Sequence, residues 1–283
     1  MKRMFIMLLV LSLIPLVALS DALYYAEDDI LMAEAVAKEW ELTLNRRDTR
    51  IDALDALAAD DSGLAILTEQ QFIEALQGYS QTERDMVENG FEIVTLLGQS
   101  DLYLVCSQAT AQNRGISDLA SLMEYLDQNE YSLMLMRSLS ASRSDYVSGE
   151  LLNALCFDTE MFLDESDKYE HINDEDNYFL VCGTEQALRF SKEGAVILGA
   201  LTEERTDEFP ELQCAGEVGL PAFSGSWYAL CARKGSNHSG LPLELSSDLL
   251  SSYYLHRPTE SISLDKEIRN LIHYMTEEGL FFY

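Results

Sequence analysis

The chain has 283 residues, of which 47% are apolar and 10% aromatic, with only 15 glycines and 5 prolines. This composition excludes a disordered or collagen-like chain and predicts a globular body of one large or two ordinary domains. Lys and Arg number 19 against 49 Asp and Glu, a formal net charge of −30. Such a surface repels phosphate backbones and anionic bilayers, so nucleic-acid binding is not expected.

The first twenty residues have the pattern of a secretory signal peptide. Two basic residues precede an apolar run that ends at Leu19, and Ala18 and Ser20 form an Ala-x-Ser cleavage site. Cleavage after Ala22 fits nearly as well. An uncleaved anchor is the alternative, although the run is shorter than the roughly 20 residues of a spanning helix and contains a proline. With no cysteine near the cut, we predict a secreted or periplasmic protein with residues 1–20 as its leader.

Helical and strand-like patterns alternate along the rest of the chain. In chain order we expect a helix at 30–42, a helix at 50–59, strands at 64–67, 91–97 and 102–106, a helix at about 117–127 opened by Ser117, a strand at 133–136, a helix at 145–155, strands at 160–163 and 178–182, a helix at 185–191, strands at 195–201 and 227–232, and a helix at 265–278 closed by Gly279. This alternation predicts an α/β chain with parallel sheets covered by helices.

The sequence lacks the common catalytic and metal-binding patterns. It contains no Gly-x-Ser-x-Gly elbow, phosphate loop or dinucleotide fingerprint, and its four histidines are scattered. The acidic stretch 158–176 lacks the spacing of a calcium loop and reads as a solvated surface. We therefore expect neither an enzyme, nor a metal site, nor a cofactor.

Five cysteines are widely and irregularly spaced, with no Cys-x-x-Cys pair. They would allow two disulfides at most with one thiol left over, or most would be small buried apolar residues. These cysteines are Cys106, Cys156, Cys182, Cys214 and Cys231.

Several segments, in order, resemble the extracytoplasmic solute receptors of tripartite tricarboxylate transporters, the Bug or TctC-like family. Residues 61–67 (DSGLAIL) resemble the family's PDGYTLL strand, and 91–107 (FEIVTLLGQSDLYLVCS) its FTPVALLGSSPLVLVV segment. Residues 144–152 (SDYVSGELL) are similar to its SxHLAGELF helix start. The longest match is 202–232 (TEERTDEFPELQCAGEVGLPAFSGSWYALCA), and 265–269 (DKEIR) resembles its DPEVR helix.

The resemblance implies an α/β, two-lobed periplasmic-binding-protein-like (type II) fold with two hinge-crossing strands, 102–106 and 227–231. One lobe would comprise 21–106 plus 230–283, and the second 107–229. It implies a monomeric receptor that captures a small carboxylate-bearing metabolite, a di- or tricarboxylate or an amino acid, and delivers it to membrane permease subunits without performing chemistry.

The expected binding residues lie where strands end. A serine-rich loop between a strand and a helix offers hydroxyls, main-chain N–H groups and a cation for an anion. An ordinary serine N-cap is the alternative for any one serine. From the family, Thr184 and the rim after 64–67 would face the same cleft. The expected ligand-binding residues are Ser138, Ser140, Ala141, Ser142, Arg143, Ser144, Thr184, Thr68, Gln70, Glu27 and Asp28.

Two departures from the family alter the expected ligand. The glycine-rich turn is replaced by 45–50 (NRRDTR), which removes main-chain donors from one wall. The first loop reads Ala26-Glu27-Asp28-Asp29 instead of a Gly-Gly stretch. Acids on one wall and donors on the other suggest an amino-acid-like zwitterion, with its ammonium near Glu27, Asp28 or Asp29 and its carboxylate at the serine loop.

Two other readings stay open. A binding-protein fold that has lost its ligand would act as a sensor or interaction protein, and the missing glycines favour it. A secreted hydrolase would need Ser140 or Ser142 as nucleophile with a histidine nearby, and the sequence offers no such partner set.

Overall fold

The computed structural model describes residues 21–77, 90–139, 142–163, 165–172, 177–236, 245–257 and 273. The predicted leader, Ser140, Ala141 and, apart from His273, the predicted helix at 265–278 lie outside these residues. Among the helices that the structure describes, none combines the length and apolar character needed to cross a membrane.

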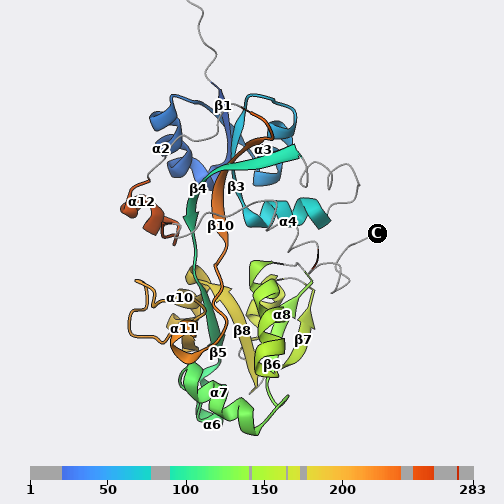
Figure 1. Ribbon diagram of the computed structural model, residues 1–283, viewed down its shortest axis with the longest axis vertical. Helices are drawn as coiled ribbons and strands as arrows, with labels where there is room; N and C mark the ends of the chain where they lie inside the picture. Colours follow the sequence, from blue (N-terminus) through green and yellow to red (C-terminus); the bar gives the residue numbers. More distant parts are fainter. Residues whose placement is uncertain are drawn as a thin grey trace, which may run out of the picture.

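Within the described residues, ten strands form two five-stranded sheets, one in each of two lobes (Figure 1). The first sheet has the order β2 (Thr43–Arg47), β1 (Ala22–Ala26), β3 (Leu64–Thr68), β10 (Trp227–Arg233) and β4 (Phe91–Gln99). The second has the order β7 (Asp158–Phe162), β6 (Met134–Ser138), β8 (Tyr178–Gly183), β5 (Leu102–Cys106) and β9 (Val196–Ala200). The predicted α/β two-lobed class is confirmed.

Each sheet contains one strand that runs against its neighbours. Within β1–β3 and within β6–β8 the pairing is parallel, as predicted. The expectation of parallel sheets holds for these strands only, because β10 is antiparallel to β3 and β4, and β5 is antiparallel to β8 and β9. Each antiparallel strand begins directly after the chain has crossed from the other lobe, so it enters its sheet without a crossover helix.

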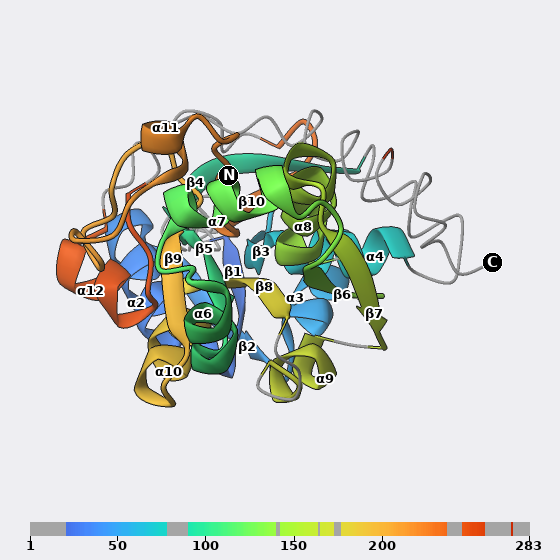
Figure 2. The same cartoon turned by 90° about the horizontal axis from the view of Figure 1, so that it is seen from below.

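Helices cover both faces of each sheet, and strand residues alternate between them. In the first lobe, β3 directs Ala65 and Leu67 toward α3 (Arg50–Ala58) and α4 (Glu69–Gln77). It directs Leu64 and Ile66 toward α2 (Ile30–Trp40) and α12 (Ser247–Ser252). In the second lobe, α7 (Leu119–Gln128) and α8 (Arg143–Leu155) lie opposite α9 (Glu165–Glu170) and α10 (Thr184–Lys192) (Figure 2). The remaining short helices are η1 (Glu27–Asp29), α6 (Gln108–Arg114) and α11 (Ala215–Val218).

The helix predicted at 117–127 begins one residue later than its expected cap. Asp118 is the N-cap, and its carboxylate accepts a 2.8 Å hydrogen bond from the backbone N–H of Ser121. The Ser121 hydroxyl in turn accepts from the backbone N–H of Asp118 at 3.1 Å. This reciprocal pair, a capping box, satisfies two backbone donors, so the prediction that Ser117 opens the helix is wrong.

Two short segments cross between the lobes and touch each other. The backbone N–H of Ser100 donates to the carbonyl of Ser226 at 2.8 Å. A β-carbon at Gly225 would lie 2.0 Å from the Ser100 carbonyl oxygen, so the two backbones meet here only because residue 225 is glycine. Because β5 pairs in the second sheet and β10 in the first, we propose lobe boundaries near residues 100 and 226 instead of 106 and 230.

All five cysteines are described, and all are free. Four are buried in the two lobes, and Cys156 is partly exposed at the end of α8. The reading of most cysteines as small buried apolar residues therefore describes this structure, whereas the two allowed disulfides are not formed.

Candidate functional site

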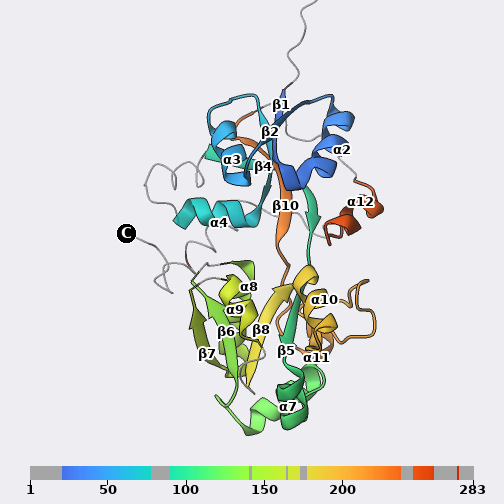
Figure 3. The ribbon, with the colours of Figure 1, turned by 180° about the vertical axis from the view of Figure 1, so that it is seen from behind.

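The seam between the lobes brings together the carboxyl ends of parallel strands from both sheets. Helix α4 begins directly after β3 on the first lobe, and α8 begins after β6 on the second (Figure 3). A hydrogen-bonded ion pair between Glu69 of α4 and Arg143 of α8 shows that these two helix starts face each other. In open α/β sheets this edge, with its helix N-termini, is where ligands bind.

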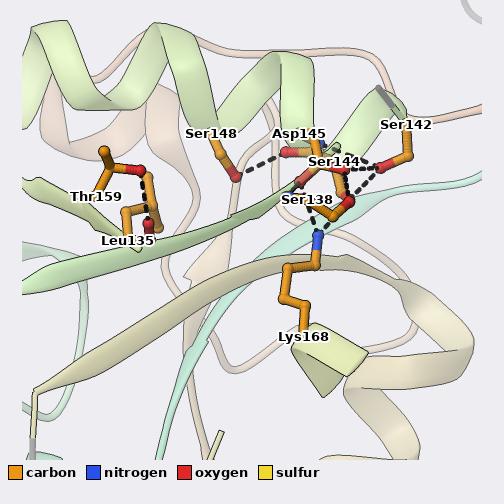
Figure 4. A network of polar contacts seen from close by, with 8 residues as sticks. All are labelled: Leu135, Ser138, Ser142, Ser144, Asp145, Ser148, Thr159 and Lys168. Atoms are coloured by element: carbon orange, nitrogen blue, oxygen red, sulfur yellow. Dashed lines mark hydrogen bonds and ion pairs between the residues drawn. The ribbon is translucent and has the colours of Figure 1, made fainter. Parts of the chain in front are cut away.

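The serine loop on the second lobe already holds a carboxylate of the protein itself. Asp145, fully buried in the first turn of α8, accepts hydrogen bonds from the backbone N–H of Ser138 at 2.7 Å and from its hydroxyl at 2.5 Å. The hydroxyl of Ser142 donates to the same carboxylate at 2.7 Å and lies 2.8 Å from that of Ser144 (Figure 4). In this structure the hydroxyls of Ser138 and Ser142 bind Asp145, and their binding of a ligand carboxylate stays a prediction.

Lys168 completes this cluster from α9. Its ammonium group donates to Asp145 Oδ1 at 3.0 Å and to Ser144 Oγ at 3.2 Å, and both charged side chains are fully buried. Burial alone would raise the pKa of Asp145, but the Lys168 charge and the hydroxyls of Ser138 and Ser142 outweigh it, and the pKa is lowered from 3.8. The reading of the acidic stretch 158–176 as solvated surface is thus wrong for Lys168.

Arg143 points out of the serine loop and across the seam. Its Nη1 lies 3.2 Å from Glu69 Oε1, and the side chains of Arg143 and Glu69 are 9% and 0% exposed. Two further bonds tie Arg143 to the crossing segment, from Nε to the Ser224 carbonyl at 3.0 Å and from Nη2 to its hydroxyl at 2.8 Å. The seam thus holds a buried cation and a buried anion from opposite lobes.

The hydroxyls predicted on the remaining rims are directed into their own lobes. Thr184, the first residue of α10, is buried, and the nearby Tyr103 hydroxyl donates to the Thr206 hydroxyl at 3.0 Å, with a pKa raised mainly by burial. Thr68 is bonded through its backbone N–H and its hydroxyl to the side-chain oxygen of Gln71. Gln70 is half-buried at the start of α4.

Two of the three acids of the first loop form ion pairs with neighbouring arginines. Glu27 pairs with Arg46 at the surface, and Asp28 is exposed. Asp29 is fully buried and receives a fork from Arg50, with Nε and Nη2 each at 2.8 Å from one carboxylate oxygen. Burial disfavours the charged form of Arg50 and by itself would lower the pKa. The hydrogen bond to Asp29 outweighs burial, so the pKa of Arg50 is raised.

Residues 45–50, which stand where the family has a glycine-rich turn, form the end of β2 and the start of α3. The last residue of β2 is Arg47, and α3 begins at Arg50 after the N-cap Thr49. Thr49 and Asp52 form a capping box, with the backbone N–H of Asp52 donating to the Thr49 hydroxyl at 3.1 Å. The first backbone donors of this helix are therefore used internally.

Other places in the described chain are less suited to a carboxylate ligand. No group of three or more metal-ligating side chains occurs among the described residues. A pocket of about 240 Å³ lies at the far end of the second lobe, between α7, the end of α8 and residues 219–221, and it is lined by Asp127 and Glu130 among apolar side chains. Two carboxylates at this pocket disfavour an anion.

Sequence reasoning placed Arg143 in the serine loop and Glu69, with Thr68 and Gln70, on the rim of the other lobe, but it did not pair them, and it missed Asp145 and Lys168. Two signals were present in the sequence. Glu69 follows the fully buried strand β3 directly, which places an acid at a buried strand end. Lys168 is the lone cation within the acidic stretch, and a lone cation among acids is a candidate for an internal partner.

Comparisons with known proteins agree with this architecture. No protein-family model matches the sequence, and no curated protein matches it. Among solved structures, the chain is similar to a TctC solute binding protein from Polaromonas, with a TM-score of 0.57, 10% identity, and coverage of 92% of this chain and 88% of that one. It is similar to MatC from Rhodopseudomonas palustris with bound malate, with a TM-score of 0.55, 14% identity, and coverage of 93% and 99%. For Rpa4515 of R. palustris with adipate, the TM-score is 0.54, the identity 14%, and the coverage 92% and 95%. The chain therefore has the fold of TctC-type solute-binding proteins over 92–93% of its length.

Proposed function

We propose that this protein is an extracytoplasmic solute receptor that captures a small carboxylate-bearing metabolite between its lobes. The observation that carries the proposal is the buried guanidinium of Arg143, which the N-terminus of α8 presents at the seam where the two sheets meet. A guanidinium beside a helix N-terminus is the combination that favours a carboxylate. Similar proteins of this fold hold malate and adipate, which are small carboxylates of this class.

The rest of the proposal follows from the family resemblance. A leader at 1–20 would export the chain to the periplasm or the outside of the cell. There it would act as a monomer and deliver its solute to the membrane permease subunits of a tripartite tricarboxylate-type transporter, without catalysing a reaction. It would need no cofactor.

Thermal unfolding in the presence of small solutes tests this function. The Tm is measured with malate, adipate, succinate, aspartate and glutamate, each added separately. A solute present at about 100 times its Kd stabilises the folded state by about 2.7 kcal/mol, which for a chain of this size raises the Tm by roughly 5 °C. The proposal fails if no small carboxylate of any kind changes the Tm.

A second function is favoured by the internal occupancy of the serine loop. Because Asp145 takes the donors of that loop, the fold would hold itself together without a ligand and act through contacts with another protein, as a sensor or interaction protein. This reading predicts that the same panel leaves the Tm unchanged. Mass spectrometry under native conditions, on protein purified from its own compartment, would then detect no bound small molecule.

A further inference from the structure

The pocket at the far end of the second lobe lies where three helices end (Figure 1). Helix α7 ends at Gln128, α8 at Leu155 and α11 at Val218, and residues near each of these ends line the pocket. Helix α8 begins at the seam and has 13 residues with a rise of about 1.5 Å each, so the pocket lies roughly 20 Å from the solute site. All of its lining residues belong to the second lobe.

The inner wall of this pocket is apolar. Leu126, Leu155 and Leu220 are buried members of one hydrophobic cluster, and all three line the pocket. Met123 packs against the same cluster and is half-buried beside them. The volume of about 240 Å³ equals that of roughly eight water molecules at about 30 Å³ each. The pocket therefore suits the apolar body of a small molecule, which would exchange water for contact with leucine side chains.

The rim of the pocket is negative for two separate reasons. Asp127 and Glu130 are exposed carboxylates at the end of α7, and within the described residues neither forms an ion pair. The end of a helix also carries a partial negative charge, which basic side chains in the last turn often compensate. Neither α7 nor α8 has a basic residue in its last turn, and the pocket's lining, as far as the chain is described, contains no Lys, Arg or His.

We propose that this pocket is a second binding site, separate from the seam, for a small organic cation with one ammonium group and an apolar body. The ammonium group is placed between Asp127 and Glu130, and the body is placed against the leucines of the inner wall. An anion of the same size is repelled by the rim, and a neutral molecule gains only the burial of its body. Because the first lobe contributes nothing to the lining, binding here requires neither lobe closure nor the proposed receptor function.

Ligands that differ only in their charged group test the proposal directly. Hexylammonium, hexanol and hexanoate share one apolar chain and carry a positive, zero and negative charge. In a titration followed by nuclear magnetic resonance, hexylammonium should shift the backbone amide signals of Leu155 and Leu220, with a Kd about tenfold or more below those of hexanol and hexanoate. The proposal is overturned if hexanol or hexanoate binds as tightly, or if hexylammonium leaves these signals unchanged.

Substitutions in the rim and in the wall test the placement of the two parts of the ligand. Asp127→Asn combined with Glu130→Gln keeps the shape of the rim and removes both charges, so it should weaken hexylammonium binding about tenfold or more and leave hexanol binding unchanged. The matched control is Glu124→Gln, an exposed glutamate of α7 outside the lining, which should leave both affinities unaltered.

Ala154→Trp fills the pocket from α8, where the alanine is exposed and lines it, and this variant should no longer bind hexylammonium although its Tm stays normal. Unchanged affinity in Ala154→Trp, or an equal loss in Glu124→Gln and in the double variant, would contradict the assignment.

Discussion

The two lobes share one strand order, yet they hold their buried rim acids in different ways. On the first lobe, Asp29 is held by the planar fork of Arg50, which also donates to the Tyr228 hydroxyl at 3.1 Å. On the second, Asp145 is held by the point charge of Lys168 and by serine donors. Each lobe thus neutralises one acid internally. The ion pair of Glu69 and Arg143 joins the two lobes.

The largest effect is expected where a fully buried charge loses its partner. Lys168→Met leaves the Asp145 carboxylate buried without its cation, and the free energy of unfolding should fall by about 3–5 kcal/mol. Chemical denaturation in urea measures this change. The control Lys192→Met, at an exposed lysine of α10, should cost less than about 0.5 kcal/mol.

A second variant keeps this test informative if Lys168→Met does not fold. Adding Asp145→Asn removes the uncompensated charge and should recover a large part of the lost stability, because an amide can still accept from Ser138 and Ser142. No recovery in the double variant would mean that Lys168 acts through packing alone.

On the first lobe the expected loss of stability is smaller, because replacing Arg50 by lysine keeps a positive charge beside Asp29. Arg50→Lys removes the fork to Asp29 and the bond to Tyr228, and it should lower the free energy of unfolding by about 1–2 kcal/mol. Arg189→Lys, at an exposed position of α10, serves as the control and should have little effect. A loss as large as that of Lys168→Met would remove the contrast between the two rims.

A pH-dependent contribution is expected beside the crossing. His256 Nε2 lies 2.9 Å from Asp101 Oδ1; burial would lower the histidine pKa, but the bond to Asp101 outweighs burial and raises it above 6.5. The charged form is therefore favoured on folding. The resulting stability is fully present below pH 6.5 and is lost as the pH rises through the higher folded pKa. Because the side chain is 38% exposed, this contribution should stay below about 1 kcal/mol.

Denaturation curves between pH 5 and 9 check this expectation. The wild-type chain should lose stability relative to His256→Gln as the pH rises, since glutamine does not titrate. Parallel curves for the two chains across the whole range would show that the His256 and Asp101 pair contributes nothing to the pH dependence.

The smallest effect is expected at the surface of the first loop. The side chains of Arg46 and Glu27 are 50% and 65% exposed. Arg46→Gln breaks their ion pair and should change the free energy of unfolding by only about 0–0.5 kcal/mol. The same substitution should leave solute affinity unaltered. A clear loss of affinity would return the acidic first loop to the binding site.

The apolar pattern was sufficient to predict eight of the ten described strands, but it missed β1 and β2 and the short helices such as α4 and α9. Strands such as β3 and β8 are buried on both faces and read as continuous apolar runs. The edge strand β2 (TLNRR) was missed because its side chains are largely exposed. Its place is set by parallel pairing with β1, and one strand's sequence does not carry that information.

The candidate site was predictable as a location and not as a set of contacts. The serine run correctly marked a loop between β6 and α8. Its occupant was missed because the sequence does not show that Asp145 turns back toward Ser138, or that Lys168 reaches it from 23 residues away. Glu69 and Arg143 are 74 residues apart and belong to different lobes, so only the folded chain brings them together.

The close approach of Gly225 to Ser100 would constrain how a solute site between the lobes changes width. Because the two crossings touch here and continue into the pairing of β4 with β10, we expect opening to be a rotation about this contact instead of a sliding of one lobe past the other. Positions on the far rims separate in proportion to their distance from this axis, while the floor of the site beside it keeps its dimensions. Solutes of different length would then be accommodated by different angles of closure over a common floor.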